Sequence, residues 1–251
     1  GFLAGLAHLN SPSLTGVAKD VYPSLLGSLQ YAAVCTRPDV STALSILGSA
    51  QASPTEAHLQ ALKKVLRYLH GTINMRLTLG GGMDHSLQLT GFADADWAND
   101  SSTRKSRSGY LFTLGRGPIS YKSKQQTCVA QSTCEAEYYS AADATKEGLH
   151  LRQLMGEIFN SPITETTTIW EDNQSAIAYS QNALVSEKTK HIGLKWHFLK
   201  DHVEQGTIKL RYLPTDQMVA DMLTKPLPGP ALARHRSAIL GGQDPMQRFI
   251  P

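Results

Sequence analysis

The sequence contains few cysteines and no long apolar segment, and both absences exclude classes of protein. Its three cysteines, Cys35, Cys128 and Cys134, form no Cys-x-x-Cys pair and no Cys/His zinc spacing. A reduced, intracellular setting is therefore favoured over a disulfide scaffold, and zinc is not indicated. No run approaches the roughly 18 apolar residues of a membrane-spanning helix, and residues 1–9 lack the basic region of a signal peptide.

The net charge of the chain is also small. The chain has 24 Lys and Arg against 21 Asp and Glu, a formal net charge of +3, and 41% of its 251 residues are hydrophobic. This length and composition predict one large or two small globular domains with ordinary cores. The mildly basic balance permits a polyanionic partner without requiring one. Because the chain begins with Gly1 rather than Met, we interpret it as a piece of a longer polypeptide.

The glycine run 80–82 separates two predicted domains. Three consecutive glycines interrupt any helix, and the apolar period changes from about four to two after them. Before the run, the sequence predicts helices over 22–34, 38–50 and 54–71, and Ser53 with Glu56 forms the expected capping box of the third. We therefore expect a helical segment over 1–80, a second domain over 84–228, and a flexible tail over 229–251, where Pro, Gly and mixed charge dominate.

The second domain is predicted to have the element order βββαβααβα. Alternating apolar residues indicate strands over 87–94, 108–114, 119–123, 166–171 and 208–212. Helical spacing indicates a long helix that begins at Ser132, with Glu135 as its capping partner, and shorter helices over 173–180, 190–205 and 215–225. The first three strands follow one another closely, so they are expected to be antiparallel.

Four acidic residues fall at the boundaries of these elements or within the last one. Asp94 ends the first strand, Glu137 lies in the first turn of the long helix, Asp172 follows the fourth strand, and Asp221 lies in the last helix. Singly, such acids usually serve as turn residues, caps or partners of the helix dipole. As a set, we interpret them as a functional site. The nearest other acids are Asp96, Asp100, Glu135 and Glu171.

Clustered carboxylates suit the hydrolysis of phosphodiesters. That reaction requires an activated water and a stabilised leaving oxygen, which two cations roughly 4 Å apart can provide. Ligands that are all oxygen favour Mg²⁺ or Mn²⁺ over zinc. We expect Asp94 to bridge two ions, Glu137 and Asp172 to complete one ion site, and Asp221 to complete the other.

Eight short motifs in order resemble one family. They are TRPDV (36–40), ALKKVLRYLHG (61–71), GFADADWA (91–98), RKS with SGY (104–110), EAEY (135–138), DNQSAI (172–177), TKHI (189–192) and ADMLTKP (220–226). Over residues 20–228 the chain resembles the C-terminal part of a copia-type retrotransposon Pol polyprotein, which comprises the end of the reverse transcriptase and its ribonuclease H domain. The family's four acids match Asp94, Glu137, Asp172 and Asp221.

The resemblance implies a ribonuclease H-like α/β fold, a five-stranded mixed sheet flanked by helices, which cuts the RNA strand of RNA–DNA hybrids with Mg²⁺ and leaves a 3′-hydroxyl and a 5′-phosphate. Residues 1–80 then resemble the thumb or connection segment of the polymerase. No Tyr-x-Asp-Asp string occurs, so the polymerase palm is missing and any synthesis needs the upstream reverse transcriptase as partner. The implied location is a cytoplasmic virus-like particle or the nucleus.

Hybrid binding is expected to depend on backbone charge and A-form shape. The candidate phosphate contacts are Arg104, Lys105, Arg107, Lys122, Lys124, Lys190 and His191. Cellular ribonucleases H often carry a histidine in the loop before the last acid, whereas the loop here reads PTDQ (214–217), which leaves His191 and His197 as candidate substitutes.

Three other interpretations compete with this one. A catalytically weak Pol fragment that binds nucleic acid or serves as a scaffold is the alternative, although the presence of all four acids argues against decay. A transposase or integrase on the same fold fits less well, because such sites usually need three carboxylates. A serine or cysteine nucleophile is not supported: Cys128 and Cys134 have no evident His partner, and Ser132 is expected to cap a helix.

Overall fold

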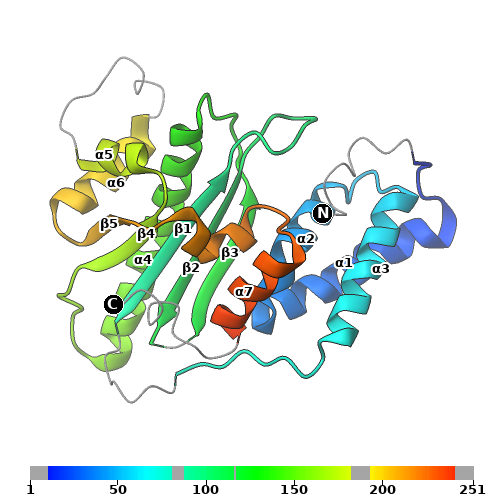
Figure 1. The fold of residues 1–251 in the computed structure, drawn as a ribbon, viewed down its shortest axis with the longest axis horizontal. Coiled ribbons are helices and arrows are strands. Elements are labelled where there is room, and N and C mark those ends of the chain that lie inside the picture. Colours follow the sequence, from blue (N-terminus) through cyan, green and yellow to red (C-terminus); the bar gives the residue numbers. More distant parts are fainter. Residues whose placement is uncertain (1–10, 81–87, 116, 182–192, 241–251) are drawn as a thin grey trace.

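The structure, a computed structural model, describes residues 11–80, 88–115, 117–181 and 193–240 (Figure 1). Its first part is helical and consists of α1 (Gly16–Thr36), the short 3-10 helix η2 (Pro38–Val40), α2 (Ser41–Ser49) and α3 (Glu56–Gly71). These helices share one core, in which Leu26, Leu44 and Leu62 are almost fully buried. The boundary predicted at residues 80–82 lies partly outside the described residues and stays a prediction.

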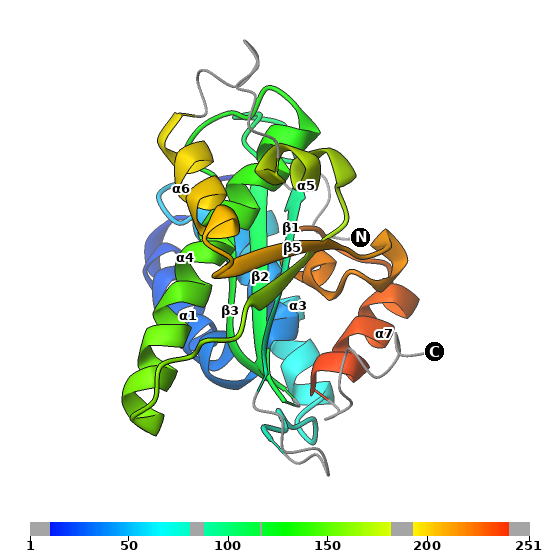
Figure 2. The ribbon, with the colours of Figure 1, turned by 90° about the vertical axis from the view of Figure 1, so that its left-hand side faces the viewer.

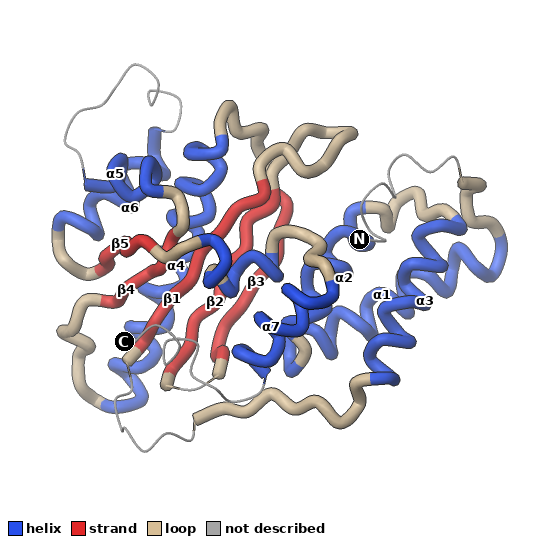
Figure 3. Tube along the Cα trace, in the orientation of Figure 1, coloured by secondary structure: helices blue, strands red, loops and turns tan. Residues whose placement is uncertain are grey.

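The second part is built on a five-stranded sheet with the strand order β3-β2-β1-β4-β5 (Figure 3). The strands are β1 (Leu89–Asp96), β2 (Arg107–Leu114), β3 (Pro118–Gln125), β4 (Thr167–Glu171) and β5 (Ile208–Tyr212). β2 runs antiparallel to β1 and β3, whereas β4 runs parallel to β1 and β5. The predicted mixed sheet flanked by helices is confirmed.

Helices cover both faces of this sheet, as Figure 2 shows. One face packs against α4 (Thr133–Phe159) and α6 (Gly193–Glu204), with α5 (Gln174–Gln181) nearby, and buries Ala93, Phe112 and Ile169. The other face packs against Met218, the 3-10 turn η5 (Val219–Leu223) and helix α7 (Gly229–Leu240), and buries Phe92 and Leu111. The 3-10 turn η4 (Thr215–Gln217) precedes Met218 and buries none of its residues. Alternate residues of β1 thus belong to different cores, as the pleat of a strand requires.

Helix α3 begins two residues later than the sequence predicts. Its N-cap is Thr55, which forms a capping box with His58 rather than Ser53 with Glu56. The cause is an extended stretch: Leu14 N–H donates to the Pro54 carbonyl at 2.9 Å, and Ser13 pairs with Thr55 in an isolated bridge. Residues 54 and 55 are therefore held out of the helix.

The prediction of an α-helix over 215–225 is wrong. The segment forms two 3-10 turns, η4 and η5, separated by Met218, which is fully buried and has an extended backbone (φ −68°, ψ 99°). The Asp221 N–H donates to the Met218 carbonyl at 3.2 Å, and the Thr224 N–H donates to the Asp221 carbonyl at the same distance. Burial of Met218 against the sheet thus interrupts the α-helix.

The predicted flexible tail is wrong over its first half. Residues 229–240 form α7, which buries Ala238, Ile239 and Leu240. Pro230 occupies the start of the helix, where proline is tolerated because its missing N–H would have no partner within the helix. Residues 241–251 lie outside the described residues. Among the described helices, none is long and apolar enough to cross a membrane.

Candidate active site

Asp94 and Asp172 meet because they leave neighbouring parallel strands at the same edge of the sheet. Asp94 lies near the carboxyl end of β1, and Asp172 directly follows β4. In open α/β sheets, ligands bind outside the carboxyl ends of parallel strands. The sheet topology therefore places both acids at the same edge of the sheet, where Asp94 is buried and Asp172 is half-buried.

The first turns of α4 bring Glu137 to the same edge. Ser132 caps this helix, since its Oγ accepts the N–H of Glu135 at 3.2 Å. The Glu135 carboxylate in turn accepts the N–H of Gln131 at 2.7 Å. Ser132 therefore caps the helix as predicted, but the Glu135 carboxylate accepts from Gln131 rather than from Ser132. Glu137 is the acid that faces the site, with 4% of its surface exposed.

The turn η5 brings Asp221 close to β1 and β2. Gly109 of β2 lies opposite Asp94 in the antiparallel ladder. A Cβ atom at Gly109 would lie 2.7 Å from both Leu223 Cβ and Thr224 Cγ2. The glycine thus permits a close approach of the turn to the sheet, which no larger residue would allow without a shift.

Three of the four predicted acids form one group. Single carboxylate oxygens of Asp94, Glu137 and Asp172 lie within 4.8 Å of one another. Glu137 Oε2 is buried and has no hydrogen-bond partner among the described residues. A buried polar atom without a partner costs free energy, which a bound cation would recover. The residues therefore fit a hard divalent cation such as Mg²⁺ or Mn²⁺.

Asp221 adjoins this group and is already paired. Its Oδ1 lies 2.7 Å from Lys225 Nζ, one turn further along the chain. The Thr224 hydroxyl between them donates to Asp94 Oδ2 and to the Asp221 carbonyl oxygen. All four predicted acids thus lie together, with Asp221 connected to the other three through the segment 221–225.

The electrostatics of the site favour a bound cation. Burial and then the charge of Asp221 raise the pKa of Asp94 to about 8. Burial, Glu171 and Asp94 raise the pKa of Glu137 well above its usual value. Burial raises the pKa of Asp221 as well, although Lys225 opposes the change. These carboxylates repel one another in a poorly solvated place, and a divalent cation would relieve that repulsion.

Hydroxyl groups that sequence reasoning missed orient the acids. Besides Thr224, Thr215 Oγ1 donates to Asp172 Oδ2 at 2.7 Å, and Ser140 Oγ donates to the carbonyl oxygen of Asp94 at 2.7 Å. Thr224 stands within the ADMLTKP motif, so its position next to a predicted ligand was an available signal. Thr215 and Ser140 had no such signal, because only the fold brings them to the acids.

Glu171 is a further acid that the sequence did not assign. It is fully buried, its Oε1 accepts the N–H of Asn173 at 3.2 Å, and its Oε2 has no hydrogen-bond partner among the described residues. Burial and the neighbouring Asp94 raise its pKa well above the usual range. Glu171 therefore adds to the crowding of carboxyl groups beneath the site.

The residues predicted to contact nucleic acid differ in how far they are exposed to solvent. Arg104, Lys122 and Lys124 are exposed and Lys105 is half-buried, so these four are available to a phosphate backbone. Lys190 and His191 lie outside the described residues. Arg107 differs from the expectation, because it is 5% exposed and its Nη1 donates to Ser45 Oγ of α2. Arg107 joins the two parts of the chain and is not presented to solvent.

The remaining candidates for chemistry lie apart from the acids or are inert. His197 is exposed on α6, and its ring packs edge-on against Trp196 at 4.8 Å between centroids. Its role in catalysis stays a prediction. Burial, Glu171 and Glu135 raise the pKa of the Cys134 thiol to about 11, so Cys134 remains protonated at neutral pH and is a poor nucleophile.

Sequence comparisons identify the family. The chain is 41% identical over 212 residues to the retrovirus-related Pol polyprotein from transposon TNT 1-94 of Nicotiana tabacum, a match that covers 84% of this chain and 16% of that protein. It is 39% identical over 218 residues to the retrovirus-related Pol polyprotein from transposon RE1 of Arabidopsis thaliana, covering 87% and 15% respectively. The chain belongs to the family of copia-type retrotransposon Pol polyproteins.

The chain spans 16% and 15% of the length of these two relatives. No protein-family model matches it. Among solved structures, ribonuclease H1 from the halophilic archaeon Halobacterium salinarum aligns with a TM-score of 0.39 at 10% identity, covering 55% of this chain and 94% of that one.

Proposed function

We propose that this chain is a metal-dependent endonuclease that hydrolyses the RNA strand of RNA–DNA hybrids during retrotransposon reverse transcription. The observation that carries the proposal is the convergence of Asp94, Glu137 and Asp172 within 4.8 Å, with Asp221 alongside. These acids come from a strand end, a helix start, a second strand end and a 3-10 turn. Nothing about the stability of the fold requires them to gather, since their mutual repulsion opposes folding.

The proposed ligands are divided between two cations. Asp94 would face both, Glu137 and Asp172 would complete one coordination sphere, and Asp221 would complete the other. When bound, Mg²⁺ or Mn²⁺ supplies charge that activates a water and stabilises the leaving oxygen. The chain's own part is to hold the carboxylates in place: Thr224 orients Asp94, and Thr215 orients Asp172.

The proposed substrate would lie across basic residues that are exposed or half-buried. Arg104 and Lys105 on the loop after β1, with Lys122 and Lys124 on edge strand β3, would contact phosphates and position the hybrid without reading its sequence. The upstream reverse transcriptase of the same polyprotein is the proposed partner, and an intracellular particle or the nucleus is the proposed location. Polymerase activity is not expected of this chain.

Cleavage of a labelled RNA–DNA hybrid tests the proposal. The chain would be incubated with Mg²⁺ or Mn²⁺, beside EDTA and an Asp172→Asn variant whose fold is verified by circular dichroism. We expect scission of the RNA strand alone, which ends in a 3′-hydroxyl and is lost in both controls. A folded chain that binds the hybrid but does not cut it would favour the alternative, a Pol fragment that binds nucleic acid.

A further inference from the structure

Lys225 forms an ion pair with Asp221, the predicted ligand that lies outside the group of three carboxylates. Its Nζ contacts Asp221 Oδ1 at 2.7 Å, and the Lys225 N–H donates to the Asp221 carbonyl at 3.1 Å, so backbone and side chain both hold the pair together. The Asp221 side chain is 8% exposed and that of Lys225 is 33% exposed. The ammonium therefore lies at the edge of the site, between the buried acids and solvent.

The ammonium compensates charge that the fold leaves unbalanced. Burial works against the charged form of Lys225, but Asp94, Asp221 and Asp96 outweigh it and raise its pKa. In the absence of a cation, the charge of Lys225 acts on both Asp94 and Asp221 and opposes part of the rise that burial causes in the pKa of each carboxyl group. Breaking such a pair without a replacement would leave a buried carboxylate uncompensated, which is costly.

The lysine also has room to leave. A cavity of about 160 Å³ lies between the helical segment and the segment after η5, and Lys225 lines it together with Asp39, Tyr68 and Met222. The four-carbon stem of a lysine is flexible, and its ammonium is a point charge without fixed geometry. The side chain can therefore turn from Asp221 past this cavity into solvent.

We propose that the ammonium of Lys225 takes the place of the second cation next to Asp221 when that cation is absent. The ammonium pairs with Asp221 in the cation-free site and leaves when the second cation binds. The first cation would be held by Asp94, Glu137 and Asp172, none of which is in the ion pair between Lys225 and Asp221. The second must displace the ammonium from Asp221, so it binds more weakly and sets the cation concentration at which the site is complete. This inference rests on the proposed two-cation nuclease and concerns how its second ion site is regulated.

Mn²⁺ binding to the whole chain without nucleic acid tests the inference. Isothermal titration calorimetry, with electron paramagnetic resonance of free Mn²⁺, would count the sites and give their affinities in four proteins. They are the unaltered chain, Lys225→Met, Lys225→Arg and Lys200→Met. Lys200 is the matched control, because it also pairs with an acid four residues away, Glu204, at 3.3 Å. Thermal melting would verify that each is folded, and Lys225→Gln replaces Lys225→Met if the latter does not fold.

We expect one tight and one weak Mn²⁺ site in the unaltered chain, in Lys225→Arg and in Lys200→Met. In Lys225→Met the second site should tighten by at least about fivefold, the factor that corresponds to an ion pair worth roughly 1 kcal/mol. The concentration of Mn²⁺ that gives half-maximal cleavage should fall in the same variant.

The outcomes separate this inference from the proposed function. An unchanged or weakened second site in Lys225→Met would overturn the role of Lys225 while the nuclease proposal stands. The absence of any Mn²⁺ site in all four folded proteins would overturn both. A tighter second site that also occurs in Lys200→Met would reveal a general effect of net charge and would overturn the local one.

Discussion

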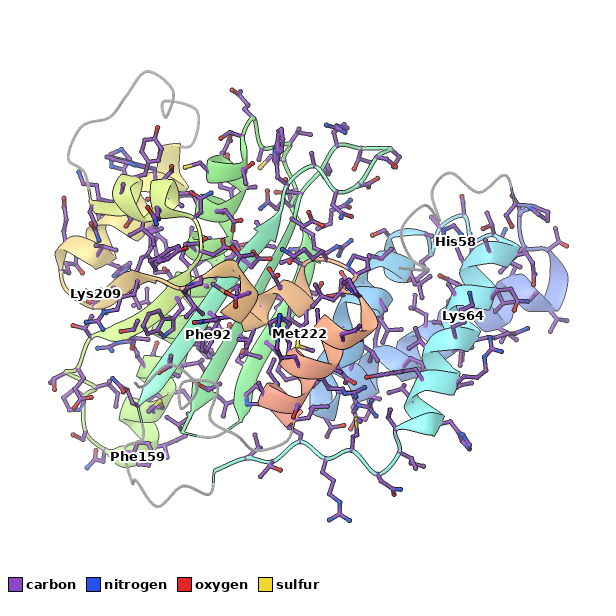
Figure 4. The ribbon with its side chains drawn as sticks, in the orientation of Figure 1. His58, Lys64, Phe92, Phe159, Lys209 and Met222 are labelled. Carbon is purple, nitrogen blue, oxygen red and sulfur yellow. The ribbon has the colours of Figure 1, made fainter. Side chains whose placement is uncertain are left out.

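The side chain of Thr42 in α2 donates a 2.6 Å hydrogen bond to the carbonyl oxygen of Met222, although the two residues lie 180 positions apart. Met222 directly follows Asp221, and Figure 4 shows it between the sheet and the helical segment. The helical segment therefore braces the turn that carries the fourth acid. Tyr121 of β3 strengthens the junction, because its hydroxyl donates to the Ala33 and Val34 carbonyls at 2.8 Å.

Replacing Thr42 with Val should weaken both the fold and the site. The Met222 carbonyl would lose its buried donor, which costs about 1–2 kcal/mol of unfolding free energy, and η5 would gain freedom. We expect a higher Mg²⁺ concentration for half-maximal cleavage, measured alongside urea unfolding. Thr36→Val is the control, since Thr36 is exposed and donates only within α1, to Ala32. Equal effects of both substitutions would contradict the brace.

Replacing Thr224 with Val should move the pH dependence of cleavage upward. The Thr224 hydroxyl donates to Asp94 and thereby lowers its pKa, so its loss disfavours the carboxylate that a cation requires. The pH of half-maximal rate should rise by roughly 0.5–1 pH unit, the equivalent of one neutral hydrogen bond. Thr224→Ser keeps the hydroxyl and should restore the original profile. A profile that Thr224→Val leaves in place would exclude this role.

Without divalent cations, the protein should lose stability as the pH rises. Asp94 titrates near its ordinary value, 3.8, when unfolded and at about 8 when folded, so between these limits the folded state holds more protons. Unfolding free energy therefore falls from about pH 4 to pH 8. Melting temperatures in EDTA measure this decline, and Mg²⁺ should reverse it progressively above neutral pH. Asp94→Asn should flatten the EDTA curve; an equally steep curve would assign the decline to other groups.

Replacing Gly109 with Ala should disturb the site from the neighbouring strand β2. The added methyl would collide with Leu223 and Thr224, both at 2.7 Å, and push η5 away from the sheet. We expect a large loss of cleavage together with a lower melting temperature. Gly71→Ala is the matched control, since no atom lies within 4 Å of a Cβ there. Full activity in Gly109→Ala would show that η5 tolerates the shift.

Neutralising Arg104 and Lys105 should weaken hybrid binding and flatten its salt dependence. Each phosphate left without its protein cation should reduce the slope of log affinity against log salt by about one. Fluorescence anisotropy of a labelled hybrid at several salt concentrations measures that slope. The double variant Lys63→Gln/Arg67→Gln removes the same charge from the exposed face of α3. If the α3 variant flattens the slope and the Arg104/Lys105 variant does not, the backbone of the hybrid contacts α3 instead of the loop after β1.

Much of the fold follows from local pattern. Alternating apolar residues that lead to Asp94 predict a strand, and Ser132 with Glu135 predicts where α4 begins, because both signals act within a few residues. The acids at strand ends were predictable for the same reason. Their convergence was not a local signal: we inferred it from four acids in matching elements, and the resemblance to a family pointed to the same four residues.

Errors occurred where distant contacts decide the local structure. The sequence predicted Arg107 to be a surface cation. It is buried instead and donates a hydrogen bond to Ser45, which lies 62 positions earlier in the chain. The segment around Met218 has helical composition, yet burial against the sheet imposes 3-10 turns. The start of α7 looks like a loop because of its prolines, although Ala238 and Ile239 supply an apolar face.

The hydrogen bond between Thr224 and Asp94 closes a loop of 130 positions, and it determines when the site can exist during synthesis. The helical core and the three antiparallel strands involve short loops and can form as soon as they leave the ribosome. The parallel strands β4 and β5 and the turn η5 join them last. A truncated chain that stops before Asp221 keeps the residues of the helical core and of all five strands but lacks the fourth acid, so the proposed cleavage depends on the segment that carries Asp221 and Thr224.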